Sequence, residues 1–315
     1  GLLIWRSMLH WLGGIGFIGM AVAILPLLRV GGMRLFQTES SDWGEKVMPR
    51  SHMAAKYIVS IYLVFTLIGV FAYWLSGMGW FDAINHSMTS VSTAGYSTSD
   101  NSMGNFGPAS HWVAIPLMLL GSLPFTLYVA SLRGNRKALF KDQQVRGFVS
   151  MLLIVCLVFS VWLWLNSEHA FIDAVRLASF NVVSIATTTG YALGDYSTWG
   201  GFAFMTFFYL TFVGGCSGST TGGLKMFRFQ VALSLLRANL KQMVHPRAVI
   251  KQQYNGHNLD EEIVRSILTF SFFITMTIAA IALFLAMLGL DPITALTGAA
   301  TAVCNVGPGL GPIIG

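Results

Sequence analysis

Apolar residues in this chain occur in uninterrupted runs of about 20, without the period-two alternation of a half-buried strand. The clear runs are residues 9–28, 57–76, 148–165 and 267–288. An α-helix of about 20 residues crosses the hydrocarbon core of a bilayer, which is about 30 Å thick. The pattern predicts an all-α membrane protein with several spanning helices.

Three shorter segments between these runs share one layout: an aspartate, a short apolar stretch and a run of small residues that contains glycine. The aspartates are Asp82, Asp173 and Asp291, and the small-residue runs are SVSTAGYST at 90–98, SIATTTGYA at 184–192 and TAVCNVGPGLG at 301–311. A helix of about 10–13 residues is about 15–20 Å long, too short to cross. We expect re-entrant helices, started by the aspartates and directing their carbonyl ends at the glycine runs.

Each of these short segments has a long apolar run on either side, so the chain is built from repeats of helix, re-entrant pore loop and helix. Four such repeats are the simplest whole, with the first and last incomplete. We expect residues 1–35 to be the closing helix of repeat 1, 50–140 to be repeat 2, 145–250 to be repeat 3 with a broken last helix and a cytosolic amphipathic segment, and 260–315 to be repeat 4, truncated after its glycine run.

Charge gives the orientation. Charged residues are 10% of the chain, against about 25% in soluble proteins. Nearly all of the 19 basic residues fall in residues 29–56, 133–146 and 225–265, which the positive-inside rule assigns to the cytoplasm. The basic charge follows topology and not one surface, so no nucleic-acid partner is expected. The three cysteines and seven histidines show no metal-ligand spacing.

The glycine runs have the chemistry of an ion filter. Moving a monovalent ion into a dry interior costs on the order of 20 kcal/mol, whereas one hydrogen-bond-like contact contributes about 1 kcal/mol. Several oxygens must therefore surround the ion together, as backbone carbonyls do in potassium channels. A single run such as TTGY at 188–191 is usually a turn between helices. Three runs on the outer side, each after a short helix, favour a filter.

The sequence resembles the TrkH-type subunit of the Trk/Ktr/HKT family of potassium transporters. The resemblance rests on WLGGIGFIGMAVAILP at 11–26, STAGYST at 92–98, ATTTGYA at 186–192, GGCSGSTTGGLK at 214–225 and NVGPGLG at 305–311. It implies four pseudo-repeats around one filter and a homodimer in the bacterial inner membrane. It also implies potassium as the transported ion, no covalently bound cofactor, contact with membrane lipid, and a cytosolic nucleotide-binding subunit of the TrkA kind that regulates flow.

The same resemblance gives the residues expected to bind the ion. They are Ser92, Thr93, Ala94 and Gly95; Thr187, Thr188, Thr189 and Gly190; and Cys304, Asn305, Val306 and Gly307. The family's first filter segment and its final helix, with the basic residue usually found there, have no counterpart in this sequence.

Residues 214–223 interrupt the apolar run that starts near Phe202 and resumes at Leu224. A stretch of glycine and small polar residues cannot be a stable helix facing lipid, so it is expected in the permeation path just inside the filter. The resemblance implies a gating loop with Gly214, Gly215, Gly218, Gly222 and Gly223. A packing kink is the alternative. The amphipathic residues 229–250 suit either the membrane surface or a cytosolic partner.

The leading functional hypothesis is potassium uptake through a carbonyl filter gated by this loop. A sodium-preferring or non-selective cation transporter is the alternative within transport. A membrane-embedded enzyme or receptor is the alternative from another class, and the spans carry no catalytic set at workable spacing. The sequence leaves open whether ions flow as in a channel or with protons or sodium as in a symporter.

Overall fold

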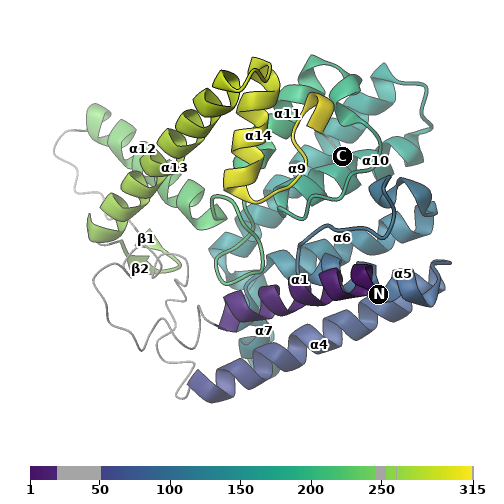
Figure 1. Ribbon diagram of the computed structural model, residues 1–315. Helices are drawn as coiled ribbons and strands as arrows, with labels where there is room; N and C mark the ends of the chain where they lie inside the picture. Colours follow the sequence, from purple (N-terminus) through teal and green to yellow (C-terminus); the bar gives the residue numbers. More distant parts are fainter. Residues whose placement is uncertain (20–50, 246–252, 260, 314–315) are drawn as a thin grey trace.

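The computed structural model describes residues 1–19, 51–245, 253–259 and 261–313. Figure 1 shows an almost entirely helical molecule. The helices are α1 (Leu2–Gly19), α4 (Ser51–Leu75), α5 (Trp80–Val91), α6 (Pro108–Ser122), α7 (Phe125–Leu132), α8 (Ala138–Lys141), α9 (Gln143–Asn166), α10 (Phe171–Ala186), α11 (Gly201–Phe212), α12 (Met226–Val244), α13 (Glu261–Met287) and α14 (Pro292–Cys304), with 3-10 turns η3 (Ser102–Asn105), η4 (Tyr196–Trp199) and η5 (Gly311–Ile313).

Three of the predicted spans are confirmed as long apolar helices. Within the described ranges, α4, α9 and α13 each hold a stretch long and apolar enough to cross a membrane. They cover the predicted runs 57–76, 148–165 and 267–288, apart from Ser76 and Leu288, which each lie one residue past a helix end. The first run, 9–28, is helical in α1 up to Gly19, and its remainder, with the rest of 1–35, lies outside the described residues.

The three predicted re-entrant helices are α5, α10 and α14. α5 packs on α4, α10 on α9 and α14 on α13, and Figure 1 places the α13–α14 pair on the opposite side of the molecule from α1 and α4. α5 has 12 residues and α14 has 13, as expected. The expected length was wrong for α10, which has 16 residues because it continues to Ala186, about one helical turn further past its aspartate than α5 does.

The aspartates lie where the sequence predicts. Asp291 is the N-cap of α14 and accepts a hydrogen bond from the Thr294 N–H at 3.0 Å. Asp82 and Asp173 lie in the first turns of α5 and α10. Negative charge at these three helix starts complements the helix dipole, and it leaves the partly negative carbonyl ends directed inward.

A sharp bend that the sequence analysis did not anticipate divides the second repeat's closing helix into α6 and α7, at an angle of 88°. Leu123 is extended, and Pro124 has no N–H and disfavours helix in the residue before it. The bend exposes the last carbonyls of α6. The Gly121 and Ser122 carbonyls accept hydrogen bonds from the N–H groups of Thr220 and Cys216, at 3.2 and 2.9 Å.

The predicted break in the third repeat's last helix is confirmed. α11 ends at Phe212 and α12 begins at Met226. Between them, residues 213–225 form a loop, which we call the intramembrane loop. A parallel bridge between Val213 and Leu224 closes the loop at its base. Helix α12 accounts for residues 229–244 of the predicted amphipathic segment, and residues 246–250 lie outside the described part of the chain.

A two-stranded hairpin departs from the all-α prediction, although it involves few residues. Strands β1 (Gln253–Tyr254) and β2 (His257–Asn258) are antiparallel. The hairpin is tied to the start of α9, since the Asn255 side chain donates to the Asp142 carboxylate at 2.8 Å. Asp142 also caps α9 by accepting from the Val145 N–H at 2.8 Å.

Helix α1 packs against the second repeat at Gly14. A Cβ added there would lie 2.6 Å from the Tyr62 hydroxyl and 3.1 Å from the Ser92 Cβ, whereas a Cβ at the neighbouring Gly13 would meet no atom within 4 Å. Small residues allow this kind of close approach between helices in membranes.

We therefore expect Gly14→Ala to destabilise the protein and Gly13→Ala to stabilise it slightly. Alanine favours a helix over glycine by about 0.5–1 kcal/mol, while overpacking a tight contact costs about 1–3 kcal/mol. Thermal unfolding of the two variants in the same detergent measures this difference. Equal melting temperatures would contradict the close packing of Gly14 in α1 against Tyr62 and Ser92.

Candidate functional site

The three short helices α5, α10 and α14, which we call the pore helices, end in the same backbone turn. Immediately after the last helical residues, the chain adopts a left-handed conformation at Thr93, Thr188 and Asn305, with φ values of 51°, 52° and 55°. Two residues later comes a glycine that also has positive φ, namely Gly95 (68°), Gly190 (83°) and Gly307 (109°). Non-glycine residues rarely adopt positive φ, so three matching turns at one spacing indicate a repeated structural device.

The hydrogen bonds of these turns also repeat. The N–H groups of Ala94, Thr189 and Val306 each donate to the carbonyl five residues earlier, at 2.9, 2.9 and 3.0 Å. The acceptors are Thr89, Ser184 and Thr301. In repeats 2 and 3 the hydroxyls of Thr89 and Ser184 also lie 2.9 and 2.7 Å from the carbonyl oxygens of Tyr96 and Tyr191. In repeat 4 the Thr301 hydroxyl instead accepts from the Gly307 N–H at 3.0 Å.

The three turns converge on one another. Gly95 lies so close to repeat 3 that a Cβ there would overlap the Thr189 carbonyl oxygen, and a Cβ at Gly190 would overlap the Val306 carbonyl oxygen. Glycine is required at both places by this approach as well as by its positive φ. Carbonyl oxygens of repeats 3 and 4 therefore lie directly against the glycines of the preceding repeats.

A cavity of about 660 Å³ lies where the turns meet, and residues of all three repeats line it. Nine of the twelve predicted ion-binding residues line this cavity: Thr93, Ala94, Gly95, Thr188, Thr189, Gly190, Asn305, Val306 and Gly307. The other three do not. Ser92 and Thr187 turn their hydroxyls back to helix carbonyls at 2.8 and 2.7 Å, and Cys304 is buried behind the turn.

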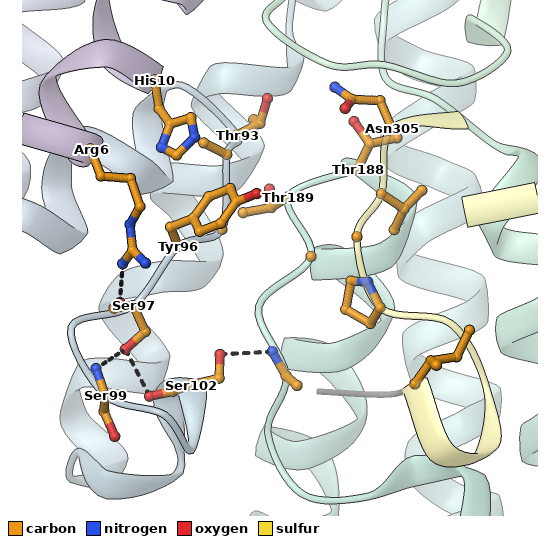
Figure 2. A pocket seen from close by; sticks show the side chains of 18 of the residues that line it. Arg6, His10, Thr93, Tyr96, Ser97, Ser99, Ser102, Thr188, Thr189 and Asn305 are labelled. Atoms are coloured by element: carbon orange, nitrogen blue, oxygen red, sulfur yellow. Dashed lines mark hydrogen bonds between the residues drawn. The ribbon is translucent and has the colours of Figure 1, made fainter. Parts of the chain in front are cut away.

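The intramembrane loop lies against one end of the cavity. The Gly222 N–H donates to the Thr188 hydroxyl at 2.7 Å, and the Thr220 hydroxyl lies 2.9 Å from the Thr93 hydroxyl. Figure 2 shows Thr93, Thr188 and Asn305 together at this end, which we call the inner end.

The loop is folded tightly, which explains its glycine content. A Cβ at Gly214 would overlap the Gly222 carbonyl oxygen across the loop, and one at Gly215 would lie 2.8 Å from the Ser122 carbonyl oxygen of the α6–α7 bend. Gly218 and Gly223 have positive φ, at 75° and 67°. A side chain at Gly214 or Gly215 would collide with these carbonyls, and one at Gly218 or Gly223 would strain the backbone.

Two residues that line the cavity from the side of α1 were not predicted. Arg6 of α1 donates to the Ser97 carbonyl, and its guanidinium lies 4.9 Å from the Tyr96 ring centroid. His10, one turn further along α1, stacks on the same ring at 4.2 Å. Figure 2 shows both side chains reaching the cavity from α1. No sequence signal identifies these contacts, since about 90 residues separate the partners.

Arg176, one turn after Asp173 on α10, forms a local ion pair. Its guanidinium contacts the Asp173 carboxylate at 2.7 Å and the His111 Nδ1 at 2.7 Å. Among the described residues, no group of three or more His, Cys, Asp or Glu side chains could hold a metal ion. The nine predicted residues bring peptide carbonyls and threonine hydroxyls to the cavity, whose lining also includes Arg6, His10 and Asp100.

Comparison with known proteins identifies the class. A family model described as TrkH, cation transport protein, matches residues 1–314. The Trk system potassium uptake protein TrkI of Halomonas elongata is 54% identical over 317 residues, which cover 100% of this chain and 64% of that protein. The Trk system potassium uptake protein TrkH of Escherichia coli K12 is 33% identical, covering 99% of this chain and 66% of the relative.

A solved structure agrees with these relatives. The crystal structure of the potassium transporter TrkH from Vibrio parahaemolyticus superimposes with a TM-score of 0.87 at 34% identity, covering 99% of this chain and 65% of that one. The chain thus spans about two thirds of the length of the proteins it matches.

The chain belongs to the TrkH family of cation transport proteins. This membership and the apolar helices make it an integral protein of the bacterial inner membrane. It also excludes the membrane-enzyme alternative, because the family is one of transporters.

Tyr191 joins two repeats behind the cavity. Its hydroxyl lies 2.6 Å from the Thr89 hydroxyl and 3.3 Å from the His86 carbonyl oxygen, both on α5. The side chain is fully buried. The equivalent residue of repeat 2 is Tyr96, which lines the cavity and is 47% exposed.

We expect Tyr191→Phe to destabilise the protein by about 0.5–1.5 kcal/mol, because it removes the buried hydrogen bonds that join Tyr191 to α5. Tyr96→Phe is the matched control and should change stability by less than about 0.5 kcal/mol. Thermal unfolding in detergent compares the two. A melting temperature for Tyr191→Phe equal to that of Tyr96→Phe would show that the buried hydroxyl does not brace the turn.

Proposed function

We propose that this chain carries the potassium-conducting filter of a bacterial uptake system. One observation supports the proposal above the others, namely the convergence of three identical left-handed turns on one cavity. In such a turn the backbone leaves the helical hydrogen-bonding pattern, and its carbonyl groups become available to bind an ion. The relatives are named potassium uptake proteins, which favours potassium as the ion.

The filter would work by supplying oxygens. Nine residues of three repeats surround the cavity, and together they present more oxygens than any single loop could. An ion that loses its water shell on entering exchanges it for these carbonyls and hydroxyls. The dipoles of α5, α10 and α14 add partial negative charge at the same place.

The proposed ion ligands are Thr93–Gly95, Thr188–Gly190 and Asn305–Gly307, in the order of the repeats. Ser92, Thr187 and Cys304 act behind them as structural residues, because their side chains do not line the cavity. This division follows the repeat boundaries proposed from the sequence, 50–140, 145–250 and 260–315, with residues 1–35 as the end of a further repeat.

The intramembrane loop is the proposed gate. It contacts the inner end of the filter through Thr220 and Gly222, so an ion that leaves the filter meets it first. The loop is joined to the cytoplasmic side through α9. The Gln144 side-chain oxygen accepts from the N–H groups of Ser217 and Phe227, at 3.0 and 3.2 Å. A change at the cytoplasmic ends of α9 and α12 can thereby reach the loop.

The proposed assembly is a homodimer with a cytosolic nucleotide-binding subunit of the TrkA kind. The word "system" in the relatives' names supports an assembly of several components. The positive-inside rule assigns residues 133–146 and 225–265 to the cytoplasmic side, where such a subunit would bind.

Replacing Gly190 tests the filter. We expect Gly190→Ala to lower rubidium uptake by at least about tenfold and to reduce its excess over sodium uptake. Alanine in a left-handed conformation costs about 1–2 kcal/mol, and its Cβ would displace the Val306 carbonyl. Rubidium and sodium uptake by cells that depend on the protein for potassium measures both effects.

Gly194 provides the matched control. It also has positive φ, at 74°, but it is exposed and does not line the cavity. Gly194→Ala should keep the ratio of rubidium to sodium uptake even where it lowers expression. If Gly190→Ala kept that ratio as well, the carbonyl filter would be wrong.

A further inference from the structure

The intramembrane loop binds the filter through the side chains at its inner end. The Thr220 hydroxyl lies 2.9 Å from the Thr93 hydroxyl of repeat 2, and the Gly222 N–H donates to the Thr188 hydroxyl of repeat 3 at 2.7 Å. Thr93 and Thr188 occupy equivalent positions, with φ values of 51° and 52°. The loop therefore repeats one kind of contact in two repeats.

The loop also lies against repeat 4, at Asn305, the residue equivalent to Thr93 and Thr188. A Cβ at Gly222 would lie 2.9 Å from the Asn305 Cβ and 3.5 Å from the Asn305 Nδ2. Figure 2 shows Asn305 beside Thr188 at the inner end, with Thr93 across from them. The loop thus contacts the innermost filter side chain of each of the three repeats.

The closed loop takes up a hydrogen-bonding position on both filter hydroxyls. Thr188 accepts from the Gly222 N–H, which can only donate, so a positive bond end points at the Thr188 oxygen. The Thr93 hydroxyl has the Ser92 carbonyl at 2.8 Å as an acceptor for its own proton. The Thr220 hydroxyl lies 2.9 Å from the Thr93 hydroxyl and 3.0 Å from the Gly121 carbonyl oxygen.

We propose that potassium at the inner end of the filter and the closed intramembrane loop exclude each other, because both bind the hydroxyl oxygens of Thr93 and Thr188. When the loop is closed, these hydroxyls bind the loop. With the loop displaced, the same oxygens become ligands of the innermost ion. This inference rests on the proposed function and assigns Thr220 as the loop residue that competes with the ion.

Competition makes the coupling reciprocal. If closure lowers the affinity for an ion at the inner end, the ion must favour the open loop by the same factor. One hydrogen bond of ordinary net strength corresponds to about a fivefold change in the ratio of closed to open loop. Potassium is then an opener of its own pathway, independent of any regulatory subunit.

The chain carries a natural reporter of loop position. Cys216 lies in the loop, is fully buried, and its N–H donates to the Ser122 carbonyl at the α6–α7 bend at 2.9 Å. A displaced loop exposes the thiol. The alkylation rate of Cys216, resolved from those of Cys156 and Cys304 by peptide mass, measures opening in the reconstituted protein.

The first test compares potassium with sodium at equal ionic strength. We expect saturating potassium to raise Cys216 alkylation about fivefold over sodium. Thr220→Val, which keeps the shape and removes the hydroxyl, should raise alkylation in sodium about fivefold, and Thr220→Ser should restore the slow rate. Thr206→Val on α11 is the control, since the Thr206 hydroxyl bonds only its own helix, at the Phe202 carbonyl.

The second test separates two roles of the filter hydroxyls: as ligands of the ion and as hydrogen-bond partners of the loop. Thr188→Val removes both roles, so alkylation should be fast in sodium and should no longer respond to potassium. Thr220→Val removes the loop's hydroxyl contacts with Thr93 and the Gly121 carbonyl but leaves both filter hydroxyls in place, so its alkylation should still rise with potassium. Identical potassium responses in these two variants would overturn the proposal.

Rubidium uptake by the same preparation distinguishes this inference from the proposed function. If rubidium is taken up selectively while Cys216 alkylation is the same in potassium and sodium, the competition is wrong and the filter stands. If no selective uptake occurs, the proposed function itself fails. Should Thr220→Val not fold, the potassium dependence of the unmodified protein alone decides the question.

Discussion

Peptide carbonyls at membrane depth have no water to bind, and this constraint governs the molecule. Helices satisfy their own carbonyls, so irregular backbone is tolerated only where protein or a water-filled path provides partners. The three turns after α5, α10 and α14 interrupt the helical hydrogen bonds by adopting the left-handed conformation at Thr93, Thr188 and Asn305. The surrounding structure is arranged to keep those turns in place and facing one another.

Hydroxyl groups do most of that positioning. Thr89 and Ser184, at the same place in two pore helices, each lie within hydrogen-bond distance of the tyrosine carbonyl that follows the glycine. Tyr191 then extends back to α5 and ties the third repeat to the second. Repeat 4 departs from this scheme, with Thr301 accepting from the Gly307 N–H and with proline in the place of tyrosine. The pseudo-symmetry is therefore one of backbone, and the side chains that support it differ.

Much of this arrangement follows from sequence, because it depends on length and local composition. The spans, the three short helices and the interrupted helix before Met226 are all readable as apolar runs and glycine clusters. The threonine positions with positive φ are not, since threonine disfavours that conformation. Nor does sequence show that Ser92, Thr187 and Cys304 turn away from the cavity, which depends on how each turn closes.

Long-range contacts account for the remaining differences. Arg6 and His10 reach the cavity from a helix that precedes the first filter turn by about 80 residues, and no motif connects them. The bend between α6 and α7 has a local cause in Pro124, but its direction depends on the loop that occupies the corner. Membership of the TrkH family supplies the class of process, cation transport, which geometry alone leaves more general.

The corner at the end of α6 has a thermodynamic consequence. The Gly121 and Ser122 carbonyls find their partners in the loop, through the N–H groups of Thr220 and Cys216. If the loop moves away in the proposed gating, those carbonyls must be solvated, because an unpaired buried carbonyl costs about 1–3 kcal/mol. Opening of the proposed gate would therefore be a wetting transition. Its equilibrium would respond to osmotic stress, since solutes too large to enter the corner withhold water from it and favour the closed state.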